Sequence, residues 1–430
     1  MKYSWGSHPN IKCNELELKS SSDLKNTILD TDEFIIHGNG RSYGDSGINK
    51  TIVKSIDYNS VISFNEEEGI LEAQSGILLK DILKIIVPKG WFLKVTPGSK
   101  YITLGGAIAS DVHGKNHHID GCFSESVLSF NLMLSNGRVE NCKKRDELFL
   151  ASCGGMGLTG VILDAKISLM KINSKNIDTI SIKTNNLKET FDIFESKALY
   201  KYSVAWLDTS ARDTDIGRGV VSIGDFSTDG DLSYVPCSSK ISIPSWTPSL
   251  LINKYTVMIF NFLYYNLQFK KIKKAKLSSD QFFYPLDGLN NWNNLYGKDG
   301  FIQYQFILPK EQSYKGMNEI LKFIASEGLF SFLAVLKLYG AENENYLSFP
   351  LKGYSLAIDF KLSKSLYDVL KKLDKIVLKY KGRIYLSKDV RINKEDFEMN
   401  YSKINQFRNI REKYQMNKKF QSLQSKRVKI

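Results

Sequence analysis

Apolar and polar positions in the first third of the chain alternate in the manner of short strands. An apolar run at 34–37 leads directly into glycines, and a pair of strands between 61 and 74 flanks an acidic turn. From about 78 to 87 the apolar residues instead recur at helical spacing. A further strand pair within 127–140 turns at Asn136-Gly137, a dipeptide typical of tight hairpins. This pattern predicts an α+β N-terminal region.

A different order of elements is predicted downstream, as strand, helix, strand, strand, helix and strand at 301–308, 311–327, 329–339, 354–362, 365–380 and 383–386. That order is the split βαβ pattern of ferredoxin-like folds. Gln303 and Gln305 share one face of the first strand, and Lys337 shares a face with Tyr339, because strand side chains alternate. Such polar residues favour a sheet face that looks onto a ligand, or alternatively a solvated outer face.

The segment 246–277 is unusually aromatic and apolar. Its uncharged core, 255–269, is shorter than the ~20 residues that a membrane-spanning helix needs. A lysine cluster follows at 270–276. An apolar, tyrosine-rich stretch with a basic end is typical of a segment at a lipid interface, and equally of a buried core helix with a solvated end.

Composition narrows the class of protein. A chain of 430 residues with 42% hydrophobic and 24% charged residues is expected to fold into two or three globular domains. The net charge is +13, but the lysines are spread along the chain and no nucleic-acid-binding motif accompanies them. We therefore expect an anionic ligand or a lipid surface as the partner, and not nucleic acid.

The cysteines, at 13, 122, 142, 153 and 237, are odd in number and lack CxxC spacing. This spacing argues against a disulfide framework and a zinc ribbon, and favours a reducing, cytoplasmic compartment. Residues 1–10 contain no apolar run that could serve as a signal peptide.

Two glycine-rich segments are candidates for a loop that approaches a phosphate. Gly38, Gly40 and Gly44 follow an apolar strand, but their spacing is not G-x-G-x-x-G and a strand at 51–56 follows instead of a helix. By themselves these glycines suit a plain turn equally well. The segment 155–160 matches G-x-G-x-x-G literally, yet a helix precedes it and a strand follows, which excludes a Rossmann site.

The segment 103–118 holds three of the five histidines. His113, His117 and His118 suggest a metal site, but Gly114 and Asn116 disfavour the helix that would bring the first two onto one face. No metal is therefore predicted. Small residues together with His113 and Lys115 better suit an anionic cofactor.

Taken together, these segments resemble the FAD-linked oxidases of the p-cresol methylhydroxylase and vanillyl-alcohol oxidase type. The resemblance is carried, in order along the chain, by 38–46, 97–118, 154–162, 301–309, 332–340, 347–360 and 382–391. It implies an α+β fold with a two-part FAD-binding domain, 1–173 and 383–430. A ferredoxin-like substrate domain on an antiparallel sheet, 174–382, would be inserted between the parts.

The resemblance also assigns residues to FAD, in four loops and at one tyrosine near the C-terminus. These are His37, Gly38, Asn39, Gly40, Arg41, Ser42, Tyr43, Gly44, Asp45, Gly98, Thr103, Leu104, Gly105, Gly106, His113, Gly114, Lys115, Asn116, Gly157, Thr159, Val161 and Tyr385. Some members of the wider family bond the flavin covalently through a histidine in the first loop. Arg41 stands at that position here, so we expect FAD to be bound without a covalent link.

By the same matching, Lys388 lies beside the flavin ring, and Tyr43, Gln303, Gln305 and Lys337 line the substrate pocket. Oxidation of an alcohol moves a hydride from carbon while the hydroxyl loses its proton, so a base or a cation must stand near. Lys388 could be the base if burial lowers its pKa, or could hold a developing alkoxide or a phosphate. We favour the second role.

One branch of the family oxidises a sugar hydroxyl to a ketone on a polyprenyl phosphate, as the first half of an epimerisation in cell-envelope polysaccharide synthesis. This branch implies an NAD(P)H-dependent short-chain reductase as pathway partner. It also implies a location at the inner face of the plasma membrane. The segment 255–276 does not match the family closely, and we hypothesise from its composition that it lies near the lipid tail and its phosphate. The alternatives are an oxidase of soluble alditols or aldonolactones that uses oxygen, and a non-catalytic flavin- or lipid-binding protein.

Overall fold

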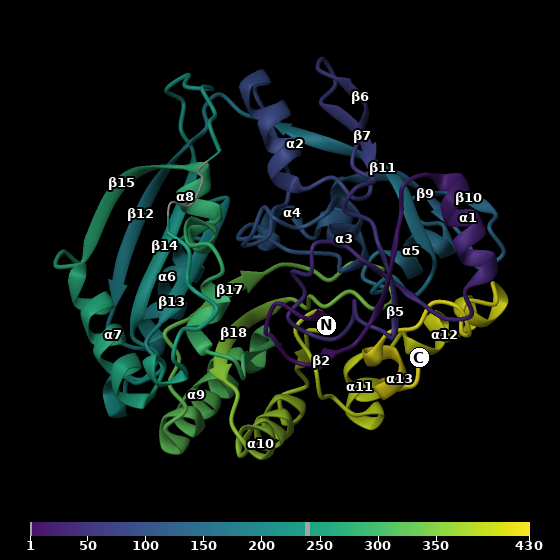
Figure 1. The fold of residues 1–430 in the computed structure, drawn as a ribbon. Helices are drawn as coiled ribbons and strands as arrows, with labels where there is room; N and C mark the ends of the chain where they lie inside the picture. Colours follow the sequence, from purple (N-terminus) through teal and green to yellow (C-terminus); the bar gives the residue numbers. More distant parts are fainter. Residues whose placement is uncertain (1, 237–240) are drawn as a thin grey trace.

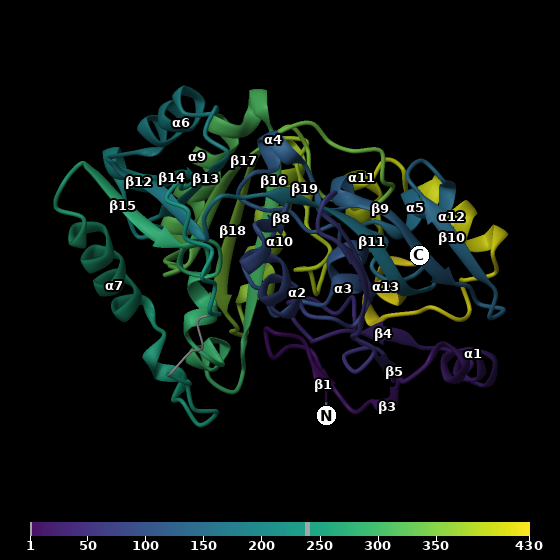
Figure 2. The ribbon, with the colours of Figure 1, turned by 90° about the horizontal axis from the view of Figure 1, so that it is seen from above.

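The computed structural model describes residues 2–236 and 241–430, and its two sheet-based parts lie side by side (Figures 1 and 2). Cys237 lies outside the described residues. Cys122, Cys142 and Cys153 are buried free thiols. The fold is α+β with mainly antiparallel sheets, as predicted.

The N-terminal part holds a parallel sheet of order β3-β5-β4 and an antiparallel sheet of order β10-β9-β11-β7-β6, with β8 also paired to β11. The strands are β3 (Asn14–Glu17), β4 (Ile35–His37), β5 (Thr51–Lys54), β6 (Val61–Asn65), β7 (Ile70–Gln74), β8 (Trp91–Leu93), β9 (Val127–Met133), β10 (Val139–Lys143) and β11 (Val161–Lys171). The helices are α1 (Ser21–Asp30), α2 (Leu79–Ile86), α3 (Leu104–Ala109), α4 (His117–Asp120) and α5 (Glu147–Ser152), and a short pair, β1 (Lys2–Tyr3) and β2 (Asn10–Ile11), stands apart. The predicted helix near 78–87 and the hairpin at Asn136-Gly137 are confirmed.

The second part is an eight-stranded sheet of order β15-β12-β14-β13-β17-β18-β16-β19. Its strands are β12 (Asn176–Thr184), β13 (Tyr202–Leu207), β14 (Gly219–Phe226), β15 (Ile272–Ser278), β16 (Phe301–Pro309), β17 (Ala334–Tyr339), β18 (Gly353–Lys361) and β19 (Arg383–Ile384). The helices are α6 (Leu187–Ser196), α7 (Lys254–Leu267), α8 (Ser279–Phe283), α9 (Lys310–Glu327) and α10 (Leu366–Lys379).

This sheet contains two ferredoxin-like units rather than one. The unit β16-α9-β17-β18-α10-β19 was predicted, and its strand order β17-β18-β16-β19 is that of the fold. The chain before it, β12-α6-β13-β14-α7-β15, repeats the same order. The two units join edge to edge where Ala205 and Trp206 pair with Leu336 and Val335. The long segment between β14 and α7 interrupts the order of strands and helices, so the sequence alone does not predict the first unit.

Two predicted strands are shorter than expected. The strand placed at 329–339 begins at Ala334, because the N–H of Ser331 donates to the Thr209 hydroxyl instead of a neighbouring strand. The last strand covers only Arg383–Ile384 before the chain turns into the loop that carries Lys388.

Helices α6, α9 and α10 pack together on one face of the large sheet, which leaves its other face turned toward the N-terminal part. After β19, helices α11 (Lys394–Asn400), α12 (Ile404–Lys413) and α13 (Leu423–Val428) return to the N-terminal part, where they appear in yellow in Figure 1. There the N–H of Phe34 donates to the Lys419 carbonyl at 2.9 Å, and Arg427 pairs with Asp45 at 2.7 Å. Buried Arg411 donates to the Leu158 and Phe420 carbonyls.

Within the described residues, no helix is both long and apolar enough to span a bilayer. The interpretation of 255–269 as a buried core helix is wrong, because α7 leaves most of its apolar side chains in solvent. The exposed fractions are 72% for Tyr255, 61% for Ile259 and 70% for Leu267.

A buried polar cluster joins the two parts. The Lys100 ammonium lies 2.5 Å from the Asp280 carboxylate, and both side chains are almost fully buried. The N–H of Lys100 and the hydroxyl of Ser99 both donate to Asp287, each at 2.8 Å. Lys100 and Asp280 thus neutralise each other across the junction, and the hydrogen bonds to Asp287 help to hold the loop at 97–100 against α8.

We expect Lys100→Ala to lower the free energy of unfolding by roughly 3–5 kcal/mol, because Asp280 loses its buried cation. Denaturant titration of the holoprotein measures this change. The control is Lys89→Ala, which breaks the exposed Lys89–Glu66 pair and should cost about 1 kcal/mol or less. Equal effects of the two substitutions would contradict the role given to Lys100.

Candidate active site

A cavity of about 1100 Å³ runs between the loops of the N-terminal part and the open face of the eight-stranded sheet. Typical small-molecule sites measure roughly 300–1,000 Å³, so this cavity has room for an extended dinucleotide and part of a second ligand. Its walls come from loops near 36–48, 96–115 and 156–162, from the sheet, and from the loop after β19.

Most of the site residues expected from the sequence line this cavity. They are His37, Gly38, Asn39, Gly40, Arg41, Ser42, Tyr43, Gly44, Gly98, Thr103, Gly105, Gly106, His113, Gly114, Lys115, Gly157, Gln303, Gln305, Lys337, Tyr385 and Lys388.

Five expected FAD contacts stand behind the cavity wall instead. Leu104 and Val161 belong to the hydrophobic core, and Asp45 pairs with Arg427. The Asn116 amide donates to the Lys94 carbonyl at 2.7 Å, and the Thr159 and Ser152 hydroxyls are 2.8 Å apart. These side chains therefore support the loops rather than form the surface that a ligand meets.

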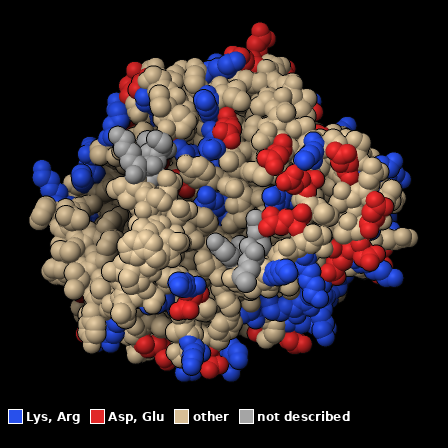
Figure 3. Space-filling model, viewed as in Figure 1, with Lys and Arg blue, Asp and Glu red and all other residues tan. Residues whose placement is uncertain are grey.

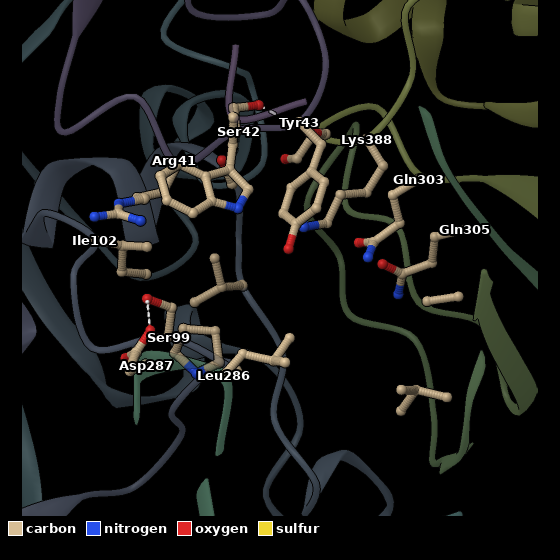
Figure 4. A pocket seen from close by; sticks show the side chains of 18 of the residues that line it. Arg41, Ser42, Tyr43, Ser99, Ile102, Leu286, Asp287, Gln303, Gln305 and Lys388 are labelled. Carbon is tan, nitrogen blue, oxygen red and sulfur yellow. Dashed lines mark hydrogen bonds between the residues drawn. The ribbon is translucent and has the colours of Figure 1, made fainter. Parts of the chain in front are cut away.

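The first glycine-rich loop is held by the chain near its other end. The Ser387 carbonyl accepts hydrogen bonds from the N–H groups of Tyr43 and Gly44, each at 3.1 Å, and from the Ser42 hydroxyl at 2.8 Å. A Cβ on Gly44 would lie 2.2 Å from the Asp389 carbonyl oxygen, so only glycine allows this approach. As a result the Lys388 ammonium stands 3.5 Å from the centre of the Tyr43 ring (Figure 4).

Gln303 and Gln305 face the same space from β16 (Figure 4). Gln303 lies directly opposite Asp359 of β18, and its amide donates to that carboxylate at 2.6 Å. The Gln305 amide donates to the Ser355 hydroxyl at 3.3 Å and lies 3.1 Å from His113 Nε2. The amides are thereby oriented on the sheet face, as the alternation along the strand predicted.

Asp359 was not anticipated as a site residue. It shares its sheet face with Ser355 and Ala357 in the segment 347–360, so the alternation that identified the glutamines could also have pointed to it. Burial raises the pKa of its carboxyl to about 7, although Gln303 and Lys388 favour the charged form.

Three lysines line the cavity. Burial lowers the pKa of Lys388 to about 7, with Asp359 opposing the shift and Lys337 adding to it. Burial also lowers the pKa of Lys337 to about 8 and that of Lys115, which is near Lys337, to about 7. These amines can therefore take up or release a proton near neutral pH, and an anionic ligand among them restores their charged form.

The three clustered histidines point in different directions. His113 lies between the rings of Tyr339 and Tyr385, while His117 Nδ1 accepts from the Gly340 N–H at 3.2 Å. His118 Nε2 is 3.0 Å from the Tyr200 carbonyl. Among the described residues, no three His, Cys, Asp or Glu side chains are placed to hold a metal ion together. Burial lowers the pKa of His113 well below its usual value, so this ring is neutral.

The residues present fit FAD. In the described chain, none of the backbone N–H groups of residues 38–42 donates to another backbone carbonyl, so they are free to face a phosphate. The buried atoms Arg41 Nε and His113 Nδ1 have no hydrogen-bond partner among residues 2–236 and 241–430, and both residues line the cavity. A Cβ added at Gly98 would meet open space, so this loop leaves room for a ligand.

Comparison with known proteins agrees with this geometry. Residues 19–143 match the model of a family described as an FAD binding domain. Over 92% of its length the chain is 33% identical to the decaprenylphosphoryl-β-D-ribose oxidase of Mycolicibacterium smegmatis, of which it covers 89%. The protein is thus an FAD-dependent oxidoreductase that acts on CH–OH groups.

The chain belongs to the FAD-linked oxidases of the p-cresol methylhydroxylase and vanillyl-alcohol oxidase type, in the family that includes the mycobacterial enzyme. An uncharacterised protein of Streptomyces coelicolor is 26% identical over 78% of this chain and 95% of its own. L-gulonolactone oxidase 3 of Arabidopsis thaliana is 24% identical, but the match covers only 31% of this chain and 24% of that protein.

We expect FAD to be released when the holoprotein is precipitated with acid. The Arg41 guanidinium stacks 3.8 Å from the centre of the Trp5 ring and cannot form the covalent bond that a histidine ring makes. The absorption spectrum of the supernatant measures the release. Flavin colour that stays in the washed pellet would contradict this expectation.

As a cation beside a developing alkoxide, Lys388 must be protonated, so we expect kcat/KM to fall as the pH rises through about 7. Asp359→Asn removes a charge that favours the protonated amine, and should move the profile to lower pH by roughly one unit. Lys388→Ala should lower kcat by about 100-fold or more.

Lys388→Arg separates the two roles of this residue, because a guanidinium stays protonated at every pH tested. Activity retained by this variant above pH 8 agrees with electrostatic stabilisation. A wild-type rate that rises through pH 7, together with an inactive arginine variant, would instead make Lys388 the base.

Proposed function

We propose that the protein oxidises a sugar hydroxyl to a ketone on a polyprenyl-phosphate-linked sugar. One observation carries this proposal: the cavity is polar and lysine-lined at one end and becomes apolar toward α7, where Phe260, Tyr264 and Trp206 line it. A sugar phosphate suits the first end and a lipid chain suits the second. The similarity to an enzyme named for decaprenylphosphoryl ribose supports the same class of substrate.

The residues divide the work by their chemistry. The amides of Gln303 and Gln305 can bind and orient sugar hydroxyls, because Asp359 and Ser355 hold them toward the cavity. Lys388, beside Tyr43, stabilises the oxygen of the reacting hydroxyl as its proton passes to solvent. Lys337 brings positive charge for the phosphate of the substrate. When bound, FAD supplies the acceptor for the hydride that leaves the carbon bearing the reacting hydroxyl.

A ketone product requires a second enzyme to complete an epimerisation. We infer that an NAD(P)H-dependent short-chain reductase takes up the product in cell-envelope polysaccharide synthesis. We also infer that both steps occur in the cytoplasm, at the inner face of the plasma membrane. The free thiols of Cys122, Cys142 and Cys153 are in keeping with a reducing compartment.

Anaerobic mixing of the holoprotein with candidate donors tests this function. We expect a ribosyl phosphate carried on a short polyprenyl chain to bleach the flavin absorbance within seconds, while alditols and aldonolactones leave it unchanged. Lys337→Gln should raise KM for the phosphorylated donor by about tenfold, because a charged contact to the phosphate is lost.

Two other results would favour the alternatives. Rapid bleaching by soluble polyols, with peroxide formed when air is admitted, would identify an alditol or aldonolactone oxidase. Bound flavin that no sugar donor reduces would leave a flavin- or lipid-binding protein.

A further inference from the structure

Helix α7 is fixed to the protein along one narrow side. Val257, Asn261 and Tyr265 are buried there. The Asn261 amide donates to Asp208 at 3.0 Å and to the Ser331 carbonyl at 3.1 Å, and the Tyr265 hydroxyl donates to the Thr184 carbonyl at 3.1 Å. These bonds tie the helix across the ends of β12 and β13, so its orientation is set by the fold.

The other sides of α7 are apolar and open to solvent. Ile259, Phe262 and Leu263 have exposed fractions of 61%, 59% and 55%, and Phe269 just beyond the helix reaches 90%. The turn before the helix adds Leu250 at 79%, and is tied to the first turn by the bond from the Thr256 hydroxyl to the Leu251 carbonyl. We call the side chains of Leu250, Tyr255, Ile259, Phe262, Leu263, Leu267 and Phe269 the α7 surface. Contiguous apolar exposure of this kind marks an interaction site.

Positive charge borders the α7 surface, and negative charge is absent from it. No Asp or Glu occurs in the sequence from 232 to 279. Lys270, Lys273 and Lys274 are exposed on and before β15, and make no ion pair among the described residues. In Figure 3 the surface over α7, at the lower left, is uncharged, and lysines lie above it along β15.

The inner edge of the same helix forms a wall of the active-site cavity. Phe260 and Tyr264 line the cavity. The ring centres of Tyr264 and Trp206 are 4.6 Å apart, and those of Phe260 and Phe332 are 5.7 Å apart. The α7 surface and the apolar end of the cavity are therefore two sides of one helix.

We propose that the α7 surface inserts into the interface of a bilayer that contains anionic lipids, with the lysines of β15 against the headgroups. The combination of exposed aromatic and aliphatic side chains, adjacent lysines and no carboxylate matches a lipid surface in both polarity and charge. Membrane docking rests on this surface alone. Only its consequence, that a polyprenyl chain passes from the bilayer along α7 into the cavity, rests on the proposed function.

Vesicle flotation of the FAD-loaded protein tests the docking. We expect binding to phosphatidylcholine vesicles that contain phosphatidylglycerol, and weaker binding without the anionic lipid or at high salt. Ile259→Glu with Phe262→Glu should reduce the bound fraction by about tenfold or more. Phe269→Glu, at a side chain with almost no protein contact, should reduce it in the same direction without affecting folding.

The matched control carries glutamates at exposed apolar positions of the N-terminal part, Leu29→Glu with Ile62→Glu, where the exposed fractions are 55% and 52%. This control should float like the wild type. Lys273→Gln with Lys274→Gln should lose the preference for phosphatidylglycerol. Light scattering without vesicles should give the same oligomeric state for the wild type and for the Ile259/Phe262 variant.

Three results would overturn the docking proposal. They are failure of the wild type to float, equal losses in the control and α7 variants, and a dimer in solution that disappears when the α7 surface is changed. Flavin reduction by a short-chain donor in solution separates this proposal from the proposed function. It should be unchanged in the docking variants, and its absence in the wild type would contradict the catalytic proposal while leaving flotation unaffected.

Discussion

The carbonyl of Ser387 is the constraint on which the rest of the site depends. It accepts hydrogen bonds from the loop that carries Tyr43, although Ser42 and Ser387 are 345 positions apart in the chain. Because Lys388 follows directly, the same bonds that hold the cofactor loop also place the amine over the Tyr43 ring. The contact is possible because Gly44 has no Cβ to meet the Asp389 carbonyl. The loop of Tyr43 and the amine of Lys388 are therefore positioned together.

The paired ferredoxin-like units explain how one sheet serves two kinds of chemistry. The predicted unit supplies Gln303, Gln305 and Lys337 to the polar end of the cavity, and Asp359 holds the Gln303 amide from the neighbouring strand. The other unit supplies Trp206 from β13 and the wall formed by α7. Since β13 and β17 pair at the junction, the two ends share one continuous sheet face. A substrate with a polar head and an apolar tail matches that arrangement.

Three lysines beside one cavity are costly for the folded protein, because each ammonium loses water when its side chain is enclosed. The cost appears as lowered pKa values, and Asp359 offsets only part of it at Lys388. Elsewhere buried charges are paired, as in Lys100 with Asp280 and Arg391 with Asp374, or bonded to backbone carbonyls, as at Arg411. The uncompensated amines are thus confined to the place where an anionic ligand binds, which is the pattern of a functional site.

Local patterns determined much of this protein. Strand alternation identified the face that bears Gln303 and Gln305, and the Asn-Gly dipeptide identified its hairpin. Glycine spacing excluded a Rossmann site. All three patterns could be recognised because each depends only on residues that are neighbours in the sequence. The family motifs then indicated FAD. Tertiary structure decided the rest. Asp359 belongs to the site only because it pairs with Gln303. Asp45 lies behind the cavity wall, where its carboxylate pairs with Arg427. The nature of α7 was open in the sequence for the same reason. An apolar helix is buried or exposed according to what packs against it, and here only one narrow side meets the protein.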